Sequence, residues 1–459
     1  NRYVIDWTDN GKDLVTFPGS TPRNISASFQ KGSACSKIGS GAPSFRAHHH
    51  GFAFSDAAIS LTESGTHERA VEALCNSSTA QLIFSLIAGG LNFEVGVLRS
   101  IPSLVSSIRD DEVNPLVDRL RETARLDWDD NEESWGFVRC SLTEGGSDRL
   151  ADRIRTRSQF WSDLTIRQQE DERKVNQLIA EIYDVSDAVS VAVPLDRVSI
   201  LRNPAYTYGL GKSPETYDAL VAQHSVKELL SYAVGCMFGR YSLDEPGLIL
   251  AEQGATLKDY LAKIPDPTFP PDADNVVPIV DGDWFEDDIV GRFRIFLRTA
   301  FGETHFDENL HFVTEALAVK NLRDYFITKA GKSEFYGDHV QRYKKRPIYW
   351  LFSSPKGSFN ALVYLHRYTP STVSTVLTYL REYVTKLESS LQQAERDQNA
   401  KEADRLRKIL IELNEYEHDT LYPKASENVA IDLDDGVKTN YPKFGAALRK
   451  IAGLEASDG

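Results

Sequence analysis

Short apolar and polar runs alternate along the first hundred residues and predict a region of mixed α and β structure. Four segments, residues 3–7, 26–30, 44–47 and 52–54, each contain an aromatic residue and are separated by Gly, Ser, Pro and Asn, which is typical of short strands. Residues 68–88 change to a helical spacing, and the segment LNFEVGVLRSIP that follows returns to strand character. We therefore expect a β-rich domain that also contains helix.

The middle of the chain has helical periodicity. Residues 107–182 are rich in charged side chains, and Val175, Leu178, Ile179 and Ile182 fall on one face of a helix. This pattern predicts a connecting region made mostly of helices.

A proline-rich segment, residues 264–274, predicts a boundary. Proline lacks the backbone N–H and clashes with the preceding turn, so this segment cannot be the interior of a helix. Beyond it, residues 284–301 and 305–326 have helical spacing, whereas residues 346–354 and 359–368 are apolar runs typical of buried strands.

Apolar residues recur every three or four positions over residues 372–413, with charges between them. A polar segment at residues 398–401 interrupts the pattern, which predicts an antiparallel helical hairpin over about 372–415. The expected fold class is therefore α+β: a mixed β-rich domain over 1–106, a helical connecting region over 107–265, and an α/β region with the hairpin over 266–459.

Composition limits the classes of protein to which the chain can belong. Apolar residues make up 41% of its 459 residues and charged residues 26%, which suits a folded protein and excludes a disordered chain. The longest apolar stretch, residues 80–91, is much shorter than the roughly 20 residues of a membrane span, so we expect no membrane segment. The first ten residues are polar and charged, so we expect no signal peptide.

The cysteines and the start of the chain add two expectations. Cys35, Cys75, Cys140 and Cys236 are too far apart for a C-x-x-C metal site or a dense disulfide scaffold, and we expect buried free thiols in a reducing cytoplasm. The sequence begins at Asn1 and its only methionine is Met237, so we interpret it as a fragment of a longer protein.

Two local basic patches stand out against a net charge of −15, a charge that excludes a polyanion binder held by overall attraction. Over residues 1–60 the balance reverses, since 6 Lys and Arg less 4 Asp and Glu leave +2. Arg, Lys and Ser bind base edges or phosphates. The predicted DNA-binding residues of this patch are Arg23, Lys31, Lys37, Ser40, Ser44, Arg46, His48 and His50. Those of the second patch are Arg342, Lys344, Lys345 and Arg346, for which a solvated edge leading into a strand is the alternative.

Motifs for catalysis are weak. The sequence NPAY at Asn203 resembles the N-P-P-Y motif of amino-methyltransferases, but one proline and an upstream glycine loop are missing, so a turn is the better interpretation. In the run His48 to His50 only two side chains can share a face, too few for a zinc site. DLDDG (432–436) is an acidic turn without the spacing of a calcium loop. We expect no catalytic residue and no metal site in this chain.

Several long blocks, in order, resemble the C-terminal half of PglX-type adenine-specific DNA methyltransferases of BREX phage-defence systems. They include SKIGSGAPSFRAHHHGFAF (36–54) and ALCNSSTAQLIFSLIAGGLNFEVGVLRSIP (73–102), which resemble the target-recognition domain of these enzymes. Downstream, YKKRPIYWLFSSPKGSFNALVYLHRY (343–368) and DLDDGVKTNYPKFG (432–445) resemble their C-terminal domain. The resemblance implies that an upstream domain, absent here, binds S-adenosylmethionine and methylates the N6 amino group of adenine.

Two hypotheses follow for the function. In the first, the chain is the DNA-recognition and C-terminal portion of such an enzyme, with double-stranded DNA and other defence-system proteins as partners and no cofactor of its own. In the second, it is an interaction module whose hairpin assembles a defence complex without reading a DNA sequence.

Overall fold

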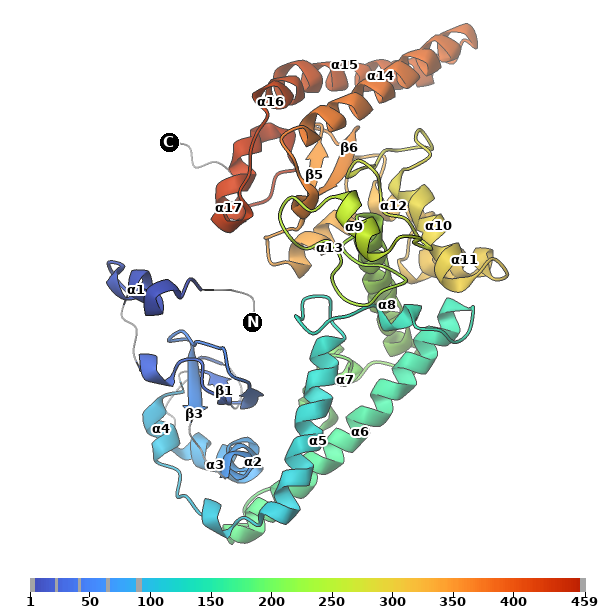
Figure 1. Cartoon of the computed structure of the whole chain (residues 1–459). Coiled ribbons are helices and arrows are strands. Elements are labelled where there is room, and N and C mark those ends of the chain that lie inside the picture. The colour runs from blue at the N-terminus through green and yellow to red at the C-terminus, as the bar shows by residue number, and fades with distance from the viewer. Residues whose placement is uncertain (1–4, 21–23, 40–42, 63–66, 88–92, 455–459) are drawn as a thin grey trace. The chain divides into compact units, whose positions relative to one another are not determined.

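A computed structural model describes residues 5–20, 24–39, 43–62, 67–87 and 93–454. The chain divides into two compact units. The first unit contains residues 1–129 and 158–213, and the second contains residues 130–157 and 214–459. The expected boundaries at residues 106 and 265 stay predictions. Helices predominate and the sheets are small and antiparallel, so the fold is of the mixed α+β kind (Figure 1).

The first unit is built on a three-stranded antiparallel sheet with the order β2-β1-β3. Its strands are β1 (Gly32–Ser36), β2 (Arg46–His48) and β3 (Ala58–Thr62). One face of this sheet packs on a core that also contains Phe45, Phe84 and Phe93. Antiparallel sheets commonly bury one face in this way and leave polar side chains on the other.

Six further helices belong wholly or partly to this unit, together with the N-terminal α1 (Thr8–Thr16). Helix α6 begins in the second unit and ends in the first. The six are α2 (Glu68–Asn76), α3 (Ser78–Ile87), α4 (Val95–Arg99), α5 (Asp110–Asp129), α6 (Leu150–Ile182) and α7 (Pro204–Tyr208).

Three of the four predicted short strands are wrong within the described residues. Residues 25–27 form a 3-10 turn and residues 5–7 are not in a strand. Phe52 accepts one backbone hydrogen bond from Phe29 (2.8 Å) without a strand being formed. Phe29 has a left-handed φ of 68°, a conformation that interrupts the regular pairing of an extended strand.

The strand predicted over residues 91–102 is also wrong for the part that the structure describes. Helix α4 occupies Val95–Arg99, and Val97 and Leu98 pack against the core from it. Phe93 pairs its backbone N–H with the carbonyl of Lys37 (2.6 Å) just after β1. One helical turn therefore brings Val97 and Leu98 into partly buried contact with the core, although the pattern assigned them to a strand.

The second unit contains a buried antiparallel sheet with the order β4-β6-β5. The segments 346–354 and 359–368, predicted as strands, contain β5 (Tyr349–Ser353) and β6 (Asn360–Tyr364), and every residue of both is buried. Strand β4 (Val276–Pro278) pairs with β6. The helices around this sheet are α8 (Pro214–Met237), α9 (Leu257–Lys263), α10 (Ile289–Phe301), α11 (Phe306–Ala316), α12 (Leu322–Phe326) and α13 (Glu334–Arg342).

Two long helices follow the sheet, α14 (Thr372–Arg396) and α15 (Ala400–Tyr416). They lie side by side (Figure 1), and Leu380 and Leu387 of α14 and Leu406 of α15 are buried in the core of the unit. A π-helical turn (Glu417–Leu421) continues α15, followed by α16 (Tyr422–Glu427) and α17 (Val437–Asn440).

The four cysteines are free and buried, as the sequence predicts. Within the described ranges no single helix has both the length and the apolar character to cross a membrane, although α2 and α3, bent by 64°, pass that test as a pair.

Candidate nucleic-acid interface

The sheet of the first unit has a packed inner face and a polar outer face. Residues directly opposite one another in an antiparallel pair share a face. Ser33 and Cys35 are buried, and their partners on β3, Leu61 and Ile59, also pack against the core. Ala34 lies between Ser33 and Cys35 and therefore points outward, together with its partner Arg46. The outward positions with polar side chains are Ser36, Arg46, His48, Ser60 and Thr62.

Gly32 allows this outer face to close tightly around His48. A Cβ atom at Gly32 would lie 2.0 Å from the carbonyl oxygen of Leu61 and 3.3 Å from Nε2 of His48. The absence of a side chain at Gly32 leaves room for the imidazole of His48, whose Nε2 forms a hydrogen bond with Oγ of Ser60 (3.0 Å). The ring of Phe54 packs on it at a centroid distance of 4.6 Å. His48 is thus held in one orientation on the outer face.

Burial sets the charge of His48. Desolvation lowers the pKa of its imidazole below the ordinary 6.5, against weaker opposing contributions from the backbone of His49 and the charge of Glu68. At neutral pH the ring is uncharged and has one donor and one acceptor nitrogen. His48 is therefore suited to hydrogen bonding on a base or sugar rather than to charge pairing with phosphate.

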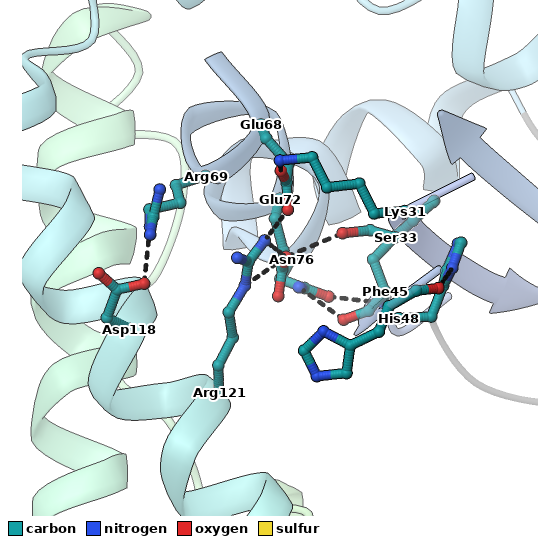
Figure 2. Close-up of polar contacts among 11 residues, drawn as sticks. Lys31, Ser33, Phe45, His48, Glu68, Arg69, Glu72, Asn76, Asp118 and Arg121 are labelled. Carbon is teal, nitrogen blue, oxygen red and sulfur yellow. Dashed lines mark hydrogen bonds and ion pairs between the residues drawn. The ribbon is translucent and has the colours of Figure 1, made fainter. Parts of the chain in front are cut away.

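Asn76, the last residue of α2, holds the segment that leads into β2. Its side-chain oxygen accepts a hydrogen bond from the N–H of Phe45 (2.8 Å), and its amide donates to the carbonyl of the same residue (3.0 Å). Phe45 is fully buried, whereas Ser44 and Arg46 on either side of it are exposed. Figure 2 shows Asn76 facing the backbone of Phe45. The clamp thus presents Ser44 and Arg46 to solvent from a fixed backbone.

A buried ionic network behind the sheet fixes α2 to both β1 and α5. Glu72 accepts hydrogen bonds from Oγ of Ser33 (2.8 Å) and from the guanidinium of Arg121 (2.5 Å), and Arg121 also pairs with Glu68 (2.9 Å). Although desolvation opposes it, the hydrogen bonds and charges of Arg121 and Lys31 lower the pKa of Glu68. These contacts are drawn in Figure 2. The outer face is therefore supported by a rigid layer.

The cations at the ends of β1 are held in partly exposed ion pairs. Lys31 is 63% exposed and pairs at 3.3 Å with Glu68, which is 17% exposed. Lys37 is 23% exposed and pairs with Asp56 at 3.3 Å and with Glu94 at 3.6 Å. Lys31 is therefore the more accessible of the two cations.

The remaining predicted residues of this patch are placed as follows. The guanidinium of Arg46 donates a hydrogen bond to the hydroxyl of Ser199. His50 is exposed, and its Nδ1 lies 3.3 Å from the carbonyl of Phe29. Arg23 and Ser40 lie outside the described residues. The structure thus brings Arg46 and His48 together on one face, with Lys31 and Lys37 at the two ends of the central strand.

The second predicted patch differs from the expectation of four surface cations. Arg342 is only 18% exposed and pairs with the buried Glu132 at 2.7 Å, which also accepts a hydrogen bond from the hydroxyl of Tyr343 (3.0 Å). Lys344 and Lys345 are exposed and have left-handed φ values of 50° and 61°. Arg342 therefore directs its charge into the unit, because it is needed to neutralise a buried carboxylate.

NPAY forms a helix cap, as the turn interpretation predicts. Asn203 is 1% exposed; its side chain accepts from the N–H of Ala205 (3.1 Å) and donates to the carbonyls of Leu195 (2.7 Å) and Val198 (2.9 Å). All its polar atoms are thus engaged, and it cannot hold an adenine. Among the described residues no group of three or more His, Cys, Asp or Glu is arranged to hold a metal ion.

Sequence reasoning missed the residues that support the interface. Glu68 and Glu72 are spaced i and i+4, and this spacing is a signal that both carboxylates lie on one face of a helix. Their partner Arg121 is about fifty positions away in the sequence, so the pairing was not predictable from local pattern. Asn76 was noted only as part of a resembling block, and its contact with Phe45 depends on the tertiary fold.

Comparison with known proteins identifies two relatives that match nearly all of the chain. It is 32% identical over 482 aligned positions to the adenine-specific methyltransferase BrxX of Escherichia coli O9:H4 (strain HS), covering 99% of this chain and 39% of the relative. It is 29% identical to the adenine-specific methyltransferase PglX of Lacticaseibacillus casei (strain Zhang), covering 99% of this chain and 38% of the relative. No known family profile matches it.

The two matches extend over both structural units, because only about 1% of the chain is left out of either alignment. They confirm the resemblance that the ordered sequence blocks indicate. The chain is therefore similar to proteins of the PglX/BrxX type over nearly its whole length, and it spans about two fifths of the length of the relatives that it matches.

Proposed function

We propose that this chain is the DNA-recognition and C-terminal portion of a site-specific DNA N6-adenine methyltransferase of a BREX phage-defence system. The observation that carries the proposal is the outer face of the sheet β2-β1-β3, on which Arg46 and His48 are presented from a backbone that Asn76 clamps from behind. Both relatives are adenine-specific methyltransferases, and a site-specific enzyme needs a rigid surface that reads bases.

The outer face carries side chains suited to duplex DNA. Arginine donates two parallel hydrogen bonds to the O6 and N7 atoms of guanine, and a hydroxyl bonds to several base edges. Arg46 would exchange its bond with Ser199 for such a contact, while Ser44 lies two positions before it. Lys31 and Lys37 have the same alternation as Ser33 and Cys35 and so do not belong to the outer face; they would contact phosphates from the two ends of β1. His48, uncharged at neutral pH, would add a neutral hydrogen bond.

Methyl transfer is assigned to a part of the enzyme outside this chain. An adenine held at a motif of the N-P-P-Y kind needs the Asn side chain available to bond its amino group, whereas the Asn of NPAY is buried and fully engaged. The residues present at NPAY therefore do not fit a target adenine. Double-stranded DNA and other defence-system proteins are the proposed partners.

A salt titration on duplex DNA tests the proposal. Fluorescence anisotropy of the chain with labelled duplexes should show an affinity that falls with salt, because phosphate contacts release counterions. Lys31→Ala should reduce the slope of the log-log plot by about 1. Arg46→Ala should cost about 1 to 3 kcal/mol on the preferred sequence if Arg46 reads a base.

The matched control is Arg125→Ala, which removes the same charge from α5, where Arg125 pairs with Glu122 and Asp129. It should leave DNA affinity unchanged. A salt slope near zero for the parent chain, or equal losses for Arg46→Ala and Arg125→Ala, would refute the proposed interface.

The alternative function is assembly of a defence complex through α14 and α15, and the exposed side chain of Ile411 on α15 (59%) offers a position at which to test it. A single exposed apolar side chain is ordinary on a protein surface and does not itself favour this function. Exposed Lys344, Lys345 and Arg346 would serve either function. Ile411→Asp separates the two, since assembly predicts lost complex formation with DNA affinity unchanged.

A further inference from the structure

The second unit contains a cavity of about 960 Å³ that the DNA-binding proposal does not use. One wall is a stripe of α14 that carries the hydroxyls of Ser374, Thr375 and Thr378. The other wall is formed by residues 284–287, which precede α10, and by Asp274. The lining residues span Ser371 to Lys386 along α14, a length of about 22 Å at roughly 1.5 Å per residue. The cavity is therefore a long groove.

The lining of this groove is acidic and aromatic. It contains four carboxylates and one ammonium, a formal excess of three negative charges, together with Trp284, Phe285 and Tyr379. The four carboxylates are Asp274, Glu286, Asp287 and Glu382.

The electrostatic effect of these carboxylates is visible at Tyr379. Its hydroxyl donates a hydrogen bond to Asp287 (2.7 Å). Burial, this hydrogen bond and the nearby charge of Asp274 raise the pKa of the phenol above its ordinary value. A group that carries positive charge is therefore stabilised in the groove, whereas an anion is repelled.

The groove already binds one cation of its own chain. The ammonium of Lys386 lies 4.5 Å from the ring centroid of Phe285, donates to the carbonyl of Trp284 (2.5 Å) and pairs with Glu382 (2.7 Å). This is the combination of aromatic face, carbonyl and carboxylate that suits an ammonium or guanidinium group. Asp274, Glu286 and Asp287 lie in the same lining and offer acceptors to further cations.

We propose that this groove binds an extended, arginine- or lysine-bearing segment of a partner protein. Its length along α14 suits an extended peptide better than a compact ligand, and the lining includes the hydroxyl-bearing side chain of Ser374, whereas the hydroxyl of Thr378 donates to the carbonyl of Ser374 (3.1 Å). The excess of carboxylates complements basic side chains. The inference does not depend on the DNA interface, which uses a different unit and the opposite charge.

A labelled peptide of alternating arginine and glycine, added to the full chain, tests the inference by fluorescence anisotropy. Binding should weaken with salt, and the counterpart peptide with glutamate in place of arginine should not bind. The double variant Glu286→Gln and Glu382→Gln should lower the affinity about fivefold to tenfold, because it removes two exposed charge pairs. Its matched control is Glu388→Gln with Glu415→Gln, which removes two exposed carboxylates of α14 and α15 outside the groove and should leave the affinity unchanged.

Three results would overturn the inference. Unchanged binding by the Glu286 and Glu382 double variant would exclude the groove. An equal loss of affinity in the control variant would show that the peptide is attracted by the overall net charge of −15 and not by the groove. Displacement of the peptide by spermidine at equal charge concentration would assign the groove to a free oligoamine instead. Circular dichroism of both double variants distinguishes lost binding from lost folding.

Discussion

Replacing Asn76 by alanine removes both hydrogen bonds that hold the backbone of Phe45. Each bond has normal geometry, 2.8 Å from the N–H of Phe45 and 3.0 Å to its carbonyl. A hydrogen bond of this kind contributes a net 0.5 to 1.5 kcal/mol, so the pair contributes about 1 to 3 kcal/mol. Asn76→Ala should therefore lower the free energy of local opening around Phe45 by that amount.

Native-state hydrogen exchange measures this opening directly. The amide of Phe45 should exchange about fivefold to 150-fold faster in Asn76→Ala than in the parent chain, the range that corresponds to about 1 to 3 kcal/mol at 25 °C. Amides of β5 and β6 belong to the second unit and should exchange at unchanged rates. They therefore serve as an internal reference.

Asn76→Asp separates the two bonds. Aspartate still accepts from the N–H of Phe45 but has no donor for the carbonyl, and it places a negative charge at the C-terminal end of α2, where the helix dipole is unfavourable to it. Protection of the Phe45 amide should fall less in Asn76→Asp than in Asn76→Ala. Unchanged protection in Asn76→Ala would refute the clamp, and with it the argument that Ser44 and Arg46 are held in fixed positions.

Three further predictions concern packing, pH and buried charge. Gly32→Ala should destabilise the first unit by roughly 1 to 3 kcal/mol in thermal unfolding, because its Cβ would lie 2.0 Å from the carbonyl oxygen of Leu61. Gly96→Ala is the control, since Gly96 of α4 has open space around it, and it should be neutral or stabilising. An equal effect of the two substitutions would contradict the close approach at Gly32. Burial lowers the pKa of His48, so on acidification the unfolded chain binds a proton at this residue before the folded chain does. The free energy of unfolding should therefore decline as pH falls below the unfolded pKa of about 6.5. An NMR titration that places the pKa of His48 above this value would contradict the prediction. Glu132→Gln should cost about 3 to 5 kcal/mol because it leaves Arg342 buried without its counter-charge, whereas Glu303→Gln, at an exposed pair with Arg298, should cost less than about 1 kcal/mol; equal shifts in the unfolding midpoint would count against the buried pair.

Sequence pattern predicted the elements whose burial is complete. The runs that contain β5 and β6 are mostly apolar, and the structure buries every residue of the two strands, so local composition was sufficient there. The short segments near the N-terminus are less determined by pattern. Val97 and Leu98 pack on the core from one helical turn, and a five-residue run cannot distinguish this from a strand.

The candidate interface was predictable in part for a similar reason. Lys31, Lys37, Arg46 and His48 were found from their charge and hydrogen-bonding types, which are properties of single residues. That Arg46 and His48 share a face depends on the register of β2 against β1, and that Arg342 is buried depends on Glu132, about two hundred positions away. Neither the strand register nor the pairing of Arg342 with Glu132 can be predicted from the local sequence.

The contact between Asn76 and Phe45 has a consequence for redesign. Asn76 binds only main-chain atoms of Phe45, so the identity of the two flanking side chains does not enter the contact. Ser44 and Arg46 can be exchanged for other residues while the anchoring of the strand is preserved. If this face reads DNA as we propose, a library randomised at these two positions would change which duplexes are preferred while the supporting contact stays the same.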